Sequence, residues 1–207
     1  MSSYLAIEGV IGAGKTSLAR LLAQRMTAKL ILEEVEENPF LEGFYSDAER
    51  YAFQTQIFFL LNRYRQLSGL FQGELFHRGV VSDYILAKDK IFAYLNLNDN
   101  ELFLYNHLYS LLEDKVPQQD LVIYLQASTD FLLRRIKERG RPFEQAITRD
   151  YIDALNQAYN HFFFHYHQTP LLVVKAEGLD FINQPQDLEW LWGELSSPPA
   201  GTRYISQ

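Results

Sequence analysis

The chain has 207 residues, which is long enough for one domain with a substantial hydrophobic core and short for two. Its 26 acidic residues outnumber its 19 lysines and arginines, and the net charge of −7 disfavours binding to a nucleic-acid polymer or an anionic membrane. The chain has no cysteine, no apolar run that could span a bilayer and no charged leader, so we expect a cytoplasmic protein without disulfides or thiolate metal sites.

Five short apolar runs recur along the chain, and longer segments with helical spacing separate them. The runs are YLAIEG (4–9), KLILEEV (29–35), VVSDY (80–84), LVIYLQA (121–127) and LLVVKAE (171–177). Strands that alternate with helices indicate an α/β fold with a five-stranded parallel sheet flanked by helices. We expect residues 1–195 to form a single domain and residues 196–207, which begin with SSPPAG, to form a flexible tail.

The first apolar run leads into GVIGAGKT at residues 9–16, which matches the phosphate-loop pattern G-x-x-x-x-G-K-[ST]. In such a loop, backbone N–H groups surround phosphate oxygens, the lysine contacts the outer phosphates and the threonine hydroxyl ligates Mg²⁺. ATP is the expected donor, because the chain lacks the N-K-x-D tetrapeptide with which GTPases read guanine. The predicted ATP-binding residues are Gly9, Gly12, Ala13, Gly14, Lys15, Thr16 and Ser17.

An acidic run, ILEEVEENPF at residues 31–40, follows the second predicted strand. Ligands of open α/β sheets bind at the carboxyl ends of the strands, so a glutamate here is a candidate for chemistry, although a solvated corner is the alternative. Alternation along the strand would send Glu34 and Glu36 to the face opposite Glu33. The negative field of the run favours a neutral acceptor molecule.

Three of the four arginines in FLLRRIKERGRPFE at residues 131–144 are candidates for binding one shared anion. Arg135 and Arg139 are four residues apart on one helical face, and Arg141 follows Gly140, which is expected to end the helix. Planar guanidinium groups suit the charge that spreads over a phosphoryl group during transfer. The alternative is a basic helix end that complements its own dipole.

Several segments together resemble one family. With the phosphate loop, the segments EEVEENPFLEGFY, FQTQIFFLLNRYRQ, KIFA and RGRPFEQ in this order resemble the deoxynucleoside kinases, particularly the bacterial deoxyguanosine and deoxyadenosine kinases, over about residues 4–190. The resemblance implies a P-loop kinase fold with a five-stranded parallel sheet and an arginine-bearing lid, usually in a homodimer. It also implies that Mg²⁺ and ATP serve to phosphorylate the 5′-hydroxyl of a deoxynucleoside.

The resemblance assigns roles in binding the acceptor sugar. It matches Glu34 to the catalytic glutamate that accepts the 5′-hydroxyl proton, with Glu37 as the fallback if the strand ends early. Tyr45 and Glu144 match the pair that binds the sugar 3′-hydroxyl.

Other matches concern the base and the phosphates. Gln54 matches the amide that reads the base edge, and Phe53 and Phe92 match the rings that enclose the base. GLDF at 178–181 resembles the loop that packs against the donor adenine. The residues matched to phosphate-contacting, catalytic cations are Lys15, Arg135, Arg139 and Arg141.

The chain departs from the family pattern at two places. Asp83, expected to hold Mg²⁺ or its water with Thr16, is followed by Tyr84, where family members commonly have arginine. Arg63 is the candidate to take over the role of that arginine. Lys88 stands near a position where some members place an aspartate against the base, and a lysine, which only donates, favours the acceptors of guanine.

Two other functions share parts of this pattern. A nucleoside monophosphate kinase of the thymidylate kinase type needs extra arginines at the acceptor site, where this chain has glutamates. A non-catalytic nucleotide-binding regulator would not need Glu34 or the lid arginines, yet the chain has both. The sequence therefore predicts a deoxynucleoside kinase with a purine substrate.

Overall fold

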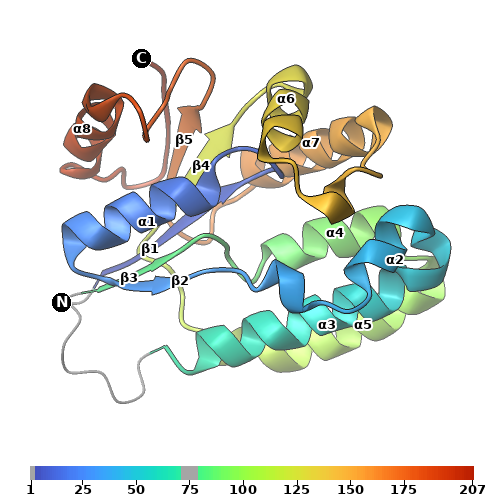
Figure 1. The fold of residues 1–207 in the computed structure, drawn as a ribbon. Helices are drawn as coiled ribbons and strands as arrows, with labels where there is room; N and C mark the ends of the chain where they lie inside the picture. Colours follow the sequence, from blue (N-terminus) through green and yellow to red (C-terminus); the bar gives the residue numbers. More distant parts are fainter. Residues whose placement is uncertain (1–2, 71–78) are drawn as a thin grey trace.

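The computed structural model describes residues 3–70 and 79–207, which contain a six-stranded parallel sheet in the order β2-β3-β1-β4-β5-β6 (Figure 1). The strands are β1 (Ser3–Gly9), β2 (Lys29–Ile31), β3 (Gly79–Ser82), β4 (Leu121–Gln126), β5 (Leu171–Lys175) and β6 (Thr202–Ile205). Helices precede and follow the strands along the chain and flank the sheet. The α/β fold class expected from the alternating pattern is confirmed.

The sixth strand corrects the expectation of a flexible tail and of a five-stranded sheet. Thr202–Ile205 runs parallel to β5, with Thr202 aligned to Leu171 and Ile205 to Val174. Without β6, the outer edge of β5 would expose unpaired backbone N–H and C=O groups. The sequence TRYI, with β-branched and aromatic residues, suits a strand, and SSPPAG is the turn that leads into it rather than the end of ordered structure.

The helices are bounded by recognisable caps. Asn98 forms a capping box with Glu101 at the start of α5, and Gly140 ends α6 in the left-handed conformation at φ 66°, as the sequence predicts. No helix in the described part of the chain is long and apolar enough to cross a membrane. The helices are α1 (Lys15–Met26), α2 (Leu41–Ser46), α3 (Ala48–Ser68), α4 (Lys88–Asn96), α5 (Asp99–Leu112), α6 (Thr129–Arg139), α7 (Arg149–Phe164) and α8 (Pro185–Leu195), with short 3₁₀ turns η1 (Val35–Glu37), η2 (Glu113–Lys115) and η3 (Pro142–Glu144).

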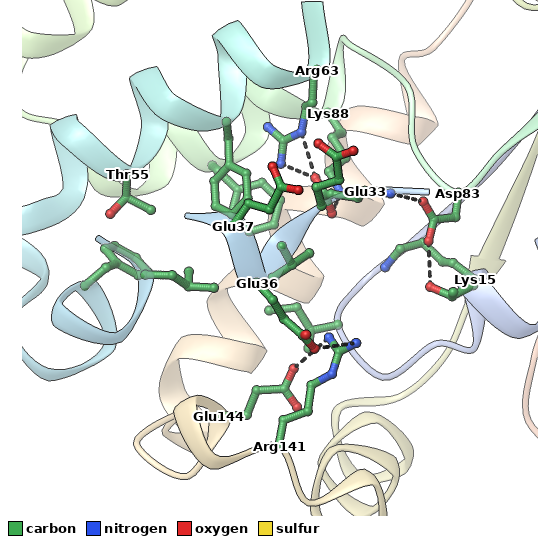
Figure 2. A pocket seen from close by; sticks show the side chains of 18 of the residues that line it. Lys15, Glu33, Glu36, Glu37, Thr55, Arg63, Asp83, Lys88, Arg141 and Glu144 are labelled. Carbon is green, nitrogen blue, oxygen red and sulfur yellow. Dashed lines mark hydrogen bonds and ion pairs between the residues drawn. The ribbon is translucent and has the colours of Figure 1, made fainter. Parts of the chain in front are cut away.

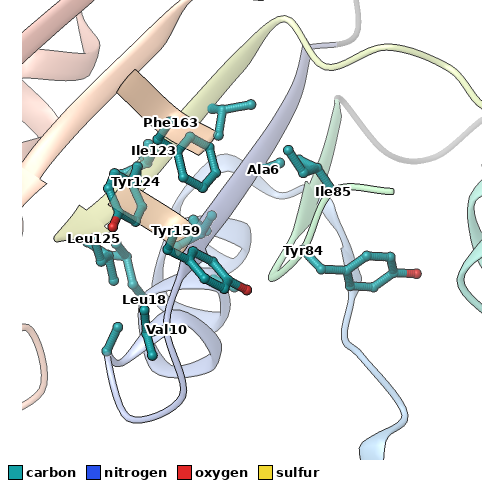
Figure 3. Close-up of a cluster of buried hydrophobic side chains, with 14 of the residues drawn as sticks. Ala6, Val10, Leu18, Tyr84, Ile85, Ile123, Tyr124, Leu125, Tyr159 and Phe163 are labelled. Atoms are coloured by element: carbon teal, nitrogen blue, oxygen red, sulfur yellow. The ribbon is translucent and has the colours of Figure 1, made fainter. Parts of the chain in front are cut away.

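The main hydrophobic core lies along the central strands (Figure 3). Residues 122–125 of β4 are all buried, as expected for a central parallel strand that is covered on both faces. Tyr124 stacks on Phe163 of α7 with ring centroids 4.3 Å apart, and Leu18 of α1 is fully buried. This packing holds the strands rigidly and therefore fixes the loops at their carboxyl ends.

The carboxyl ends of β1, β2 and β3 lie next to one another because these strands are parallel neighbours. The phosphate loop follows β1, the glutamate run follows β2 and Asp83 follows β3. A smaller cluster formed by Leu41, Phe44 and Ala52 packs against Phe143 of η3. It connects α2 and α3 to the segment between α6 and α7, which reaches towards α2 in Figure 1.

Candidate active site

The phosphate loop has the backbone geometry that its glycines permit. Gly12 and Gly14 have φ angles of 91° and 96°, which side-chain-bearing residues rarely adopt. A Cβ atom at Gly12 would also lie 2.7 Å from the carbonyl oxygen of Leu132. Lys15 opens α1 and folds back over the loop, donating to the carbonyl oxygens of Gly9 at 2.7 Å and Val10 at 3.1 Å. The helix amino terminus therefore faces the space where phosphates are expected.

Two ionisable side chains, the partly buried Lys15 and the buried Glu8, lie at this loop. Burial and, next, the charge of Lys88 lower the pKa of Lys15 to about 8. Glu8, in the strand before the loop, is fully buried and accepts hydrogen bonds from the backbone N–H groups of Gly9 and Ile85. Burial raises the pKa of Glu8. Glu8 thus ties β1 to the segment that follows β3.

Asp83 connects the phosphate loop to the glutamate run. Its Oδ2 atom accepts a 2.6 Å hydrogen bond from the Thr16 hydroxyl, and its Oδ1 atom accepts a 2.8 Å hydrogen bond from the backbone N–H of Glu33. A hydroxyl and a carboxylate at the phosphate loop form the oxygen donor set that Mg²⁺ prefers. The two residues predicted to bind the metal, Thr16 and Asp83, thus fit that ion.

Glu33 is the deepest carboxylate of the acidic run (Figure 2). Its Oε1 atom accepts from Nε and Nη2 of Arg63 at 2.7 and 2.5 Å, and its Oε2 atom accepts from Nζ of Lys88 at 2.7 Å. Burial would raise the pKa of Glu33, but the charges of Arg63 and then Lys88 outweigh it and hold the pKa well below its usual range. Arg63 also bonds to Asp89.

The other glutamates of the run lie nearer to solvent. The Glu34 side chain is 37% exposed, accepts from the Asn62 amide at 3.0 Å and lies 3.6 Å from Arg65. Glu36 is more exposed and lies 3.7 Å from Arg141 of the segment after α6. The alternation used in the sequence analysis does not apply here, because β2 ends at Ile31 and the glutamates lie in an irregular segment and in η1.

These groups surround a cavity of about 410 Å³, a size typical of small-molecule sites. Ile11 and Lys15 line it on the phosphate-loop side, and residues of α3, α4 and the segment after α6 line its other walls. Among the predicted site residues outside the loop glycines, the lining includes Lys15, Thr16, Glu34, Tyr45, Asp83, Lys88, Phe92, Arg139, Arg141 and Glu144. Lining residues to which the sequence analysis gave no site role include Glu33, Gln56, Phe59, Tyr151 and Tyr159.

The structure corrects the choice of residues on α3. Gln54 is exposed, and neither it nor Phe53 lines the cavity. Gln56 is buried in the lining, and its amide donates to the carboxylate of Asp89 at 2.5 Å and to the Asp89 carbonyl at 3.0 Å. A shift of two positions along a helix turns the side chain by about 200° around the helix axis. Gln54 therefore points away from the cavity that Gln56 faces. Phe59, one turn after Gln56, supplies the ring on this wall.

The end of α6 and residues 140–148, which we call the lid, supply the opposite wall. Glu144 is buried and accepts from Nη2 of Arg139 at 2.5 Å, while Arg141 lies 3.8 Å from it. The Tyr45 ring stacks on Phe143 of the lid, with centroids 6.5 Å apart. Burial raises the pKa of Tyr45, which keeps its hydroxyl protonated and able to donate.

Arg135 is the lid arginine that the structure places away from the cavity. It lies over the Phe131 ring at 5.8 Å and does not line the cavity. Hydrogen bonds from Asn183 and, less strongly, the charge of Arg135 lower the pKa of Asp180 in the 178–181 segment. Gly178 of that segment has a positive φ of 89°.

Comparison with known proteins places this site in a family. The family model described as deoxynucleoside kinase matches residues 5–196. The chain belongs to the deoxynucleoside kinase family. It is 38% identical over 192 residues to a deoxyguanosine kinase of Bacillus subtilis, covering 90% of this chain and 92% of that protein. It is also 32% identical over 196 residues to a deoxyadenosine kinase of Lactobacillus acidophilus, covering 88% and 89%.

A solved structure agrees with the sequence relatives. The structure of deoxyadenosine kinase from M. mycoides with bound dATP superposes with a TM-score of 0.80 at 31% identity, covering 94% of this chain and all of that one. The resemblance that the sequence motifs indicated is confirmed, and the chain is a deoxynucleoside kinase.

The assignment of Gln56, rather than Gln54, as the glutamine that contacts the substrate can be tested directly. We expect Gln56→Ala to raise the KM for the deoxynucleoside about tenfold, the effect of losing a hydrogen bond worth about 1.4 kcal/mol, as steady-state kinetics would measure. Gln54→Ala is the matched control on the exposed face of α3 and should leave KM unchanged. An increase in KM in Gln54→Ala, with no increase in Gln56→Ala, would contradict this assignment.

Proposed function

We propose that this deoxynucleoside kinase transfers the γ-phosphate of ATP to the 5′-hydroxyl of a purine deoxynucleoside, with Glu33 as the carboxylate that accepts the hydroxyl proton. The observation that carries the proposal is the position of Glu33, which lines the cavity while its own backbone N–H is bonded to Asp83 beside the phosphate loop. An acceptor hydroxyl at Glu33 would thus lie next to the phosphate donor.

The donor side follows from the loop geometry. Backbone N–H groups of residues 12–16 and the Lys15 ammonium would hold the ATP phosphates. Thr16 and Asp83 would hold Mg²⁺, directly or through water, and the bound ion would neutralise charge on the phosphates. ATP as donor also agrees with a cytoplasmic location.

The lid arginines would stabilise the phosphoryl group in transfer. Arg139 and Arg141 line the cavity and are held by Glu144, so their guanidinium groups face the same space as Glu33. Charge on the equatorial oxygens of the phosphoryl group would attract them. Arg135, beside the 178–181 segment, would act on the donor nucleotide from outside the cavity. Tyr45 and Glu144 line the wall where a sugar hydroxyl would bind.

The substrate base would lie along α3 and α4. Gln56 supplies an amide that can donate and accept, and Phe59 and Phe92 supply aromatic rings. The deoxyguanosine and deoxyadenosine kinases among the relatives support a purine substrate. Lys88 no longer supports a choice of guanine, because its ammonium group bonds to Glu33. Base preference would therefore come from Gln56, whose amide is held by Asp89.

The substrate class can be tested with labelled ATP and Mg²⁺. Each deoxynucleoside, ribonucleoside and nucleoside monophosphate is offered in turn, and transfer of label is measured. We expect label on purine deoxynucleosides, since relatives of this chain are deoxyguanosine and deoxyadenosine kinases. Label only on monophosphates would overturn the proposal in favour of a monophosphate kinase, and no transfer at all would favour a non-catalytic role.

The choice between neighbouring glutamates has its own test. Glu33→Gln should lower kcat at least about 10²-fold, the usual scale of a general base, while deoxynucleoside binding persists. Glu34→Gln is the matched control, because Glu34 is half-exposed and interacts with Asn62 and Arg65 at the rim. A large loss in Glu34→Gln together with a small loss in Glu33→Gln would restore the assignment made from sequence.

We also propose that the chain forms a homodimer through the helices beside the cavity. Exposed apolar side chains gather on α3, α4 and α5, namely Leu61, Tyr94, Phe103, Leu104 and Leu111. Burying such a surface against a second copy removes apolar area from water.

Sedimentation equilibrium tests this interface. The unmodified protein should sediment as a dimer, and the double variant Phe103→Glu with Leu104→Glu as a monomer, because a charge in an apolar interface must be desolvated. Ile182→Glu, an exposed apolar position outside this patch, is the control and should remain dimeric. A monomeric unmodified protein, or a dimeric double variant, would contradict the proposed interface.

A further inference from the structure

Lys88 is a buried cation that the reaction scheme above leaves without a role. It is the first residue of α4 and only 2% exposed. Its ammonium nitrogen lies 2.7 Å from Oε2 of Glu33 and about 6 Å from the ring centroids of Phe92 and Tyr84. Removing a lysine from water is costly unless it is paired, and Glu33 supplies the pairing charge. The ammonium group of Lys88 therefore interacts with Glu33 and not with solvent.

The two oxygens of Glu33 are held by cations from different elements. Arg63 of α3 donates twice to Oε1, and Lys88 of α4 donates to Oε2. Arg63 is itself anchored by Asp89. The last torsion of a glutamate side chain is broad and roughly two-fold, so a cation on one oxygen alone leaves the carboxylate plane loosely defined. Cations on both oxygens fix the plane.

The residue after Asp83 does not supply this charge. Tyr84 is buried, and its hydroxyl donates to Gln66 of α3 at 2.5 Å. The family pattern expects an arginine at position 84. Here the positive charge next to Glu33 comes from residues elsewhere in the chain, Arg63 and Lys88. Figure 2 shows Arg63 and Lys88 both next to Glu33, with Asp83 on the side of the phosphate loop.

We propose that Lys88 is a positioning residue for phosphoryl transfer, which fixes the second oxygen of Glu33 and so aims the carboxylate at the acceptor hydroxyl. This inference rests on the proposed role of Glu33 as the proton acceptor. Lys88 is then needed for turnover and not for recognition of the base.

The test compares Lys88→Met, Lys88→Arg and the control Lys90→Met. Lys90 lies on the same helix, is partly exposed and pairs with Glu113 outside the cavity. Lys88→Met should lower kcat by about 10²-fold, the scale of a misplaced catalytic group, with the KM for the deoxynucleoside changed by less than about threefold. Lys88→Arg should recover most of the activity, and Lys90→Met should match the unmodified protein.

The outcomes separate this inference from the proposed function. Normal kcat in Lys88→Met while Glu33→Gln is inactive overturns the role of Lys88 alone. Retained activity in Glu33→Gln overturns the proposed base and, with it, the inference. A large rise in the KM for the deoxynucleoside in folded Lys88→Met, or no recovery of kcat in folded Lys88→Arg, also overturns it. If urea unfolding shows that Lys88→Met does not fold, Lys88→Gln, which keeps a donor without the charge, must show the lowered kcat with the KM for the deoxynucleoside nearly unchanged.

Discussion

The pairing of the Glu33 carboxylate, which is 13% exposed, with Arg63 and Lys88 is the interaction on which the arrangement of the active site depends. Taking a single carboxylate out of water costs several kcal/mol, and two cations on its two oxygens offset that cost. The cations come from α3 and α4, and Asp89 holds Arg63 in turn. The ion cluster therefore joins two helices to the end of β2 and sets the width of the cavity between them.

The proposed role of Glu33 is compatible with the effect of this cluster on its acidity. A glutamate whose pKa lies well below its usual range is a weak base. Phosphoryl transfer through a loose transition state needs positioning and electrostatic stabilisation more than early proton removal. In the proposed mechanism, an ionised carboxylate fixed in orientation supplies the positioning. Asp83, bonded to Thr16 and to the Glu33 backbone, fixes its distance from the phosphate loop.

The parts of the site that the sequence predicted correctly are those with local causes. The phosphate loop is formed by backbone within eight residues, so its glycines, Lys15 and Thr16 identify it without knowledge of the rest of the fold. Gly140 ends α6 for an equally local reason, its left-handed backbone conformation. Two assignments came from matching this chain to the family, and they depend on the exact register of that match. The match gave Glu34 as the base, whereas Glu33 is the glutamate that pairs with Arg63 and Lys88. It also gave Gln54 as the amide that reads the base, whereas Gln56, two residues later, lines the cavity.

The sequence by itself determined the α/β class, the phosphate loop and membership of a kinase family. Strand and helix periodicity and a contiguous loop each depend on residues that are close together in the chain. Only the tertiary structure decided which glutamate pairs with two cations, which glutamine faces the cavity and that residues 202–205 complete the sheet. These features depend on contacts between residues far apart in the chain, such as Glu33 with Lys88 and β6 with β5. Side chains acquire such contacts only when packing brings separate elements together.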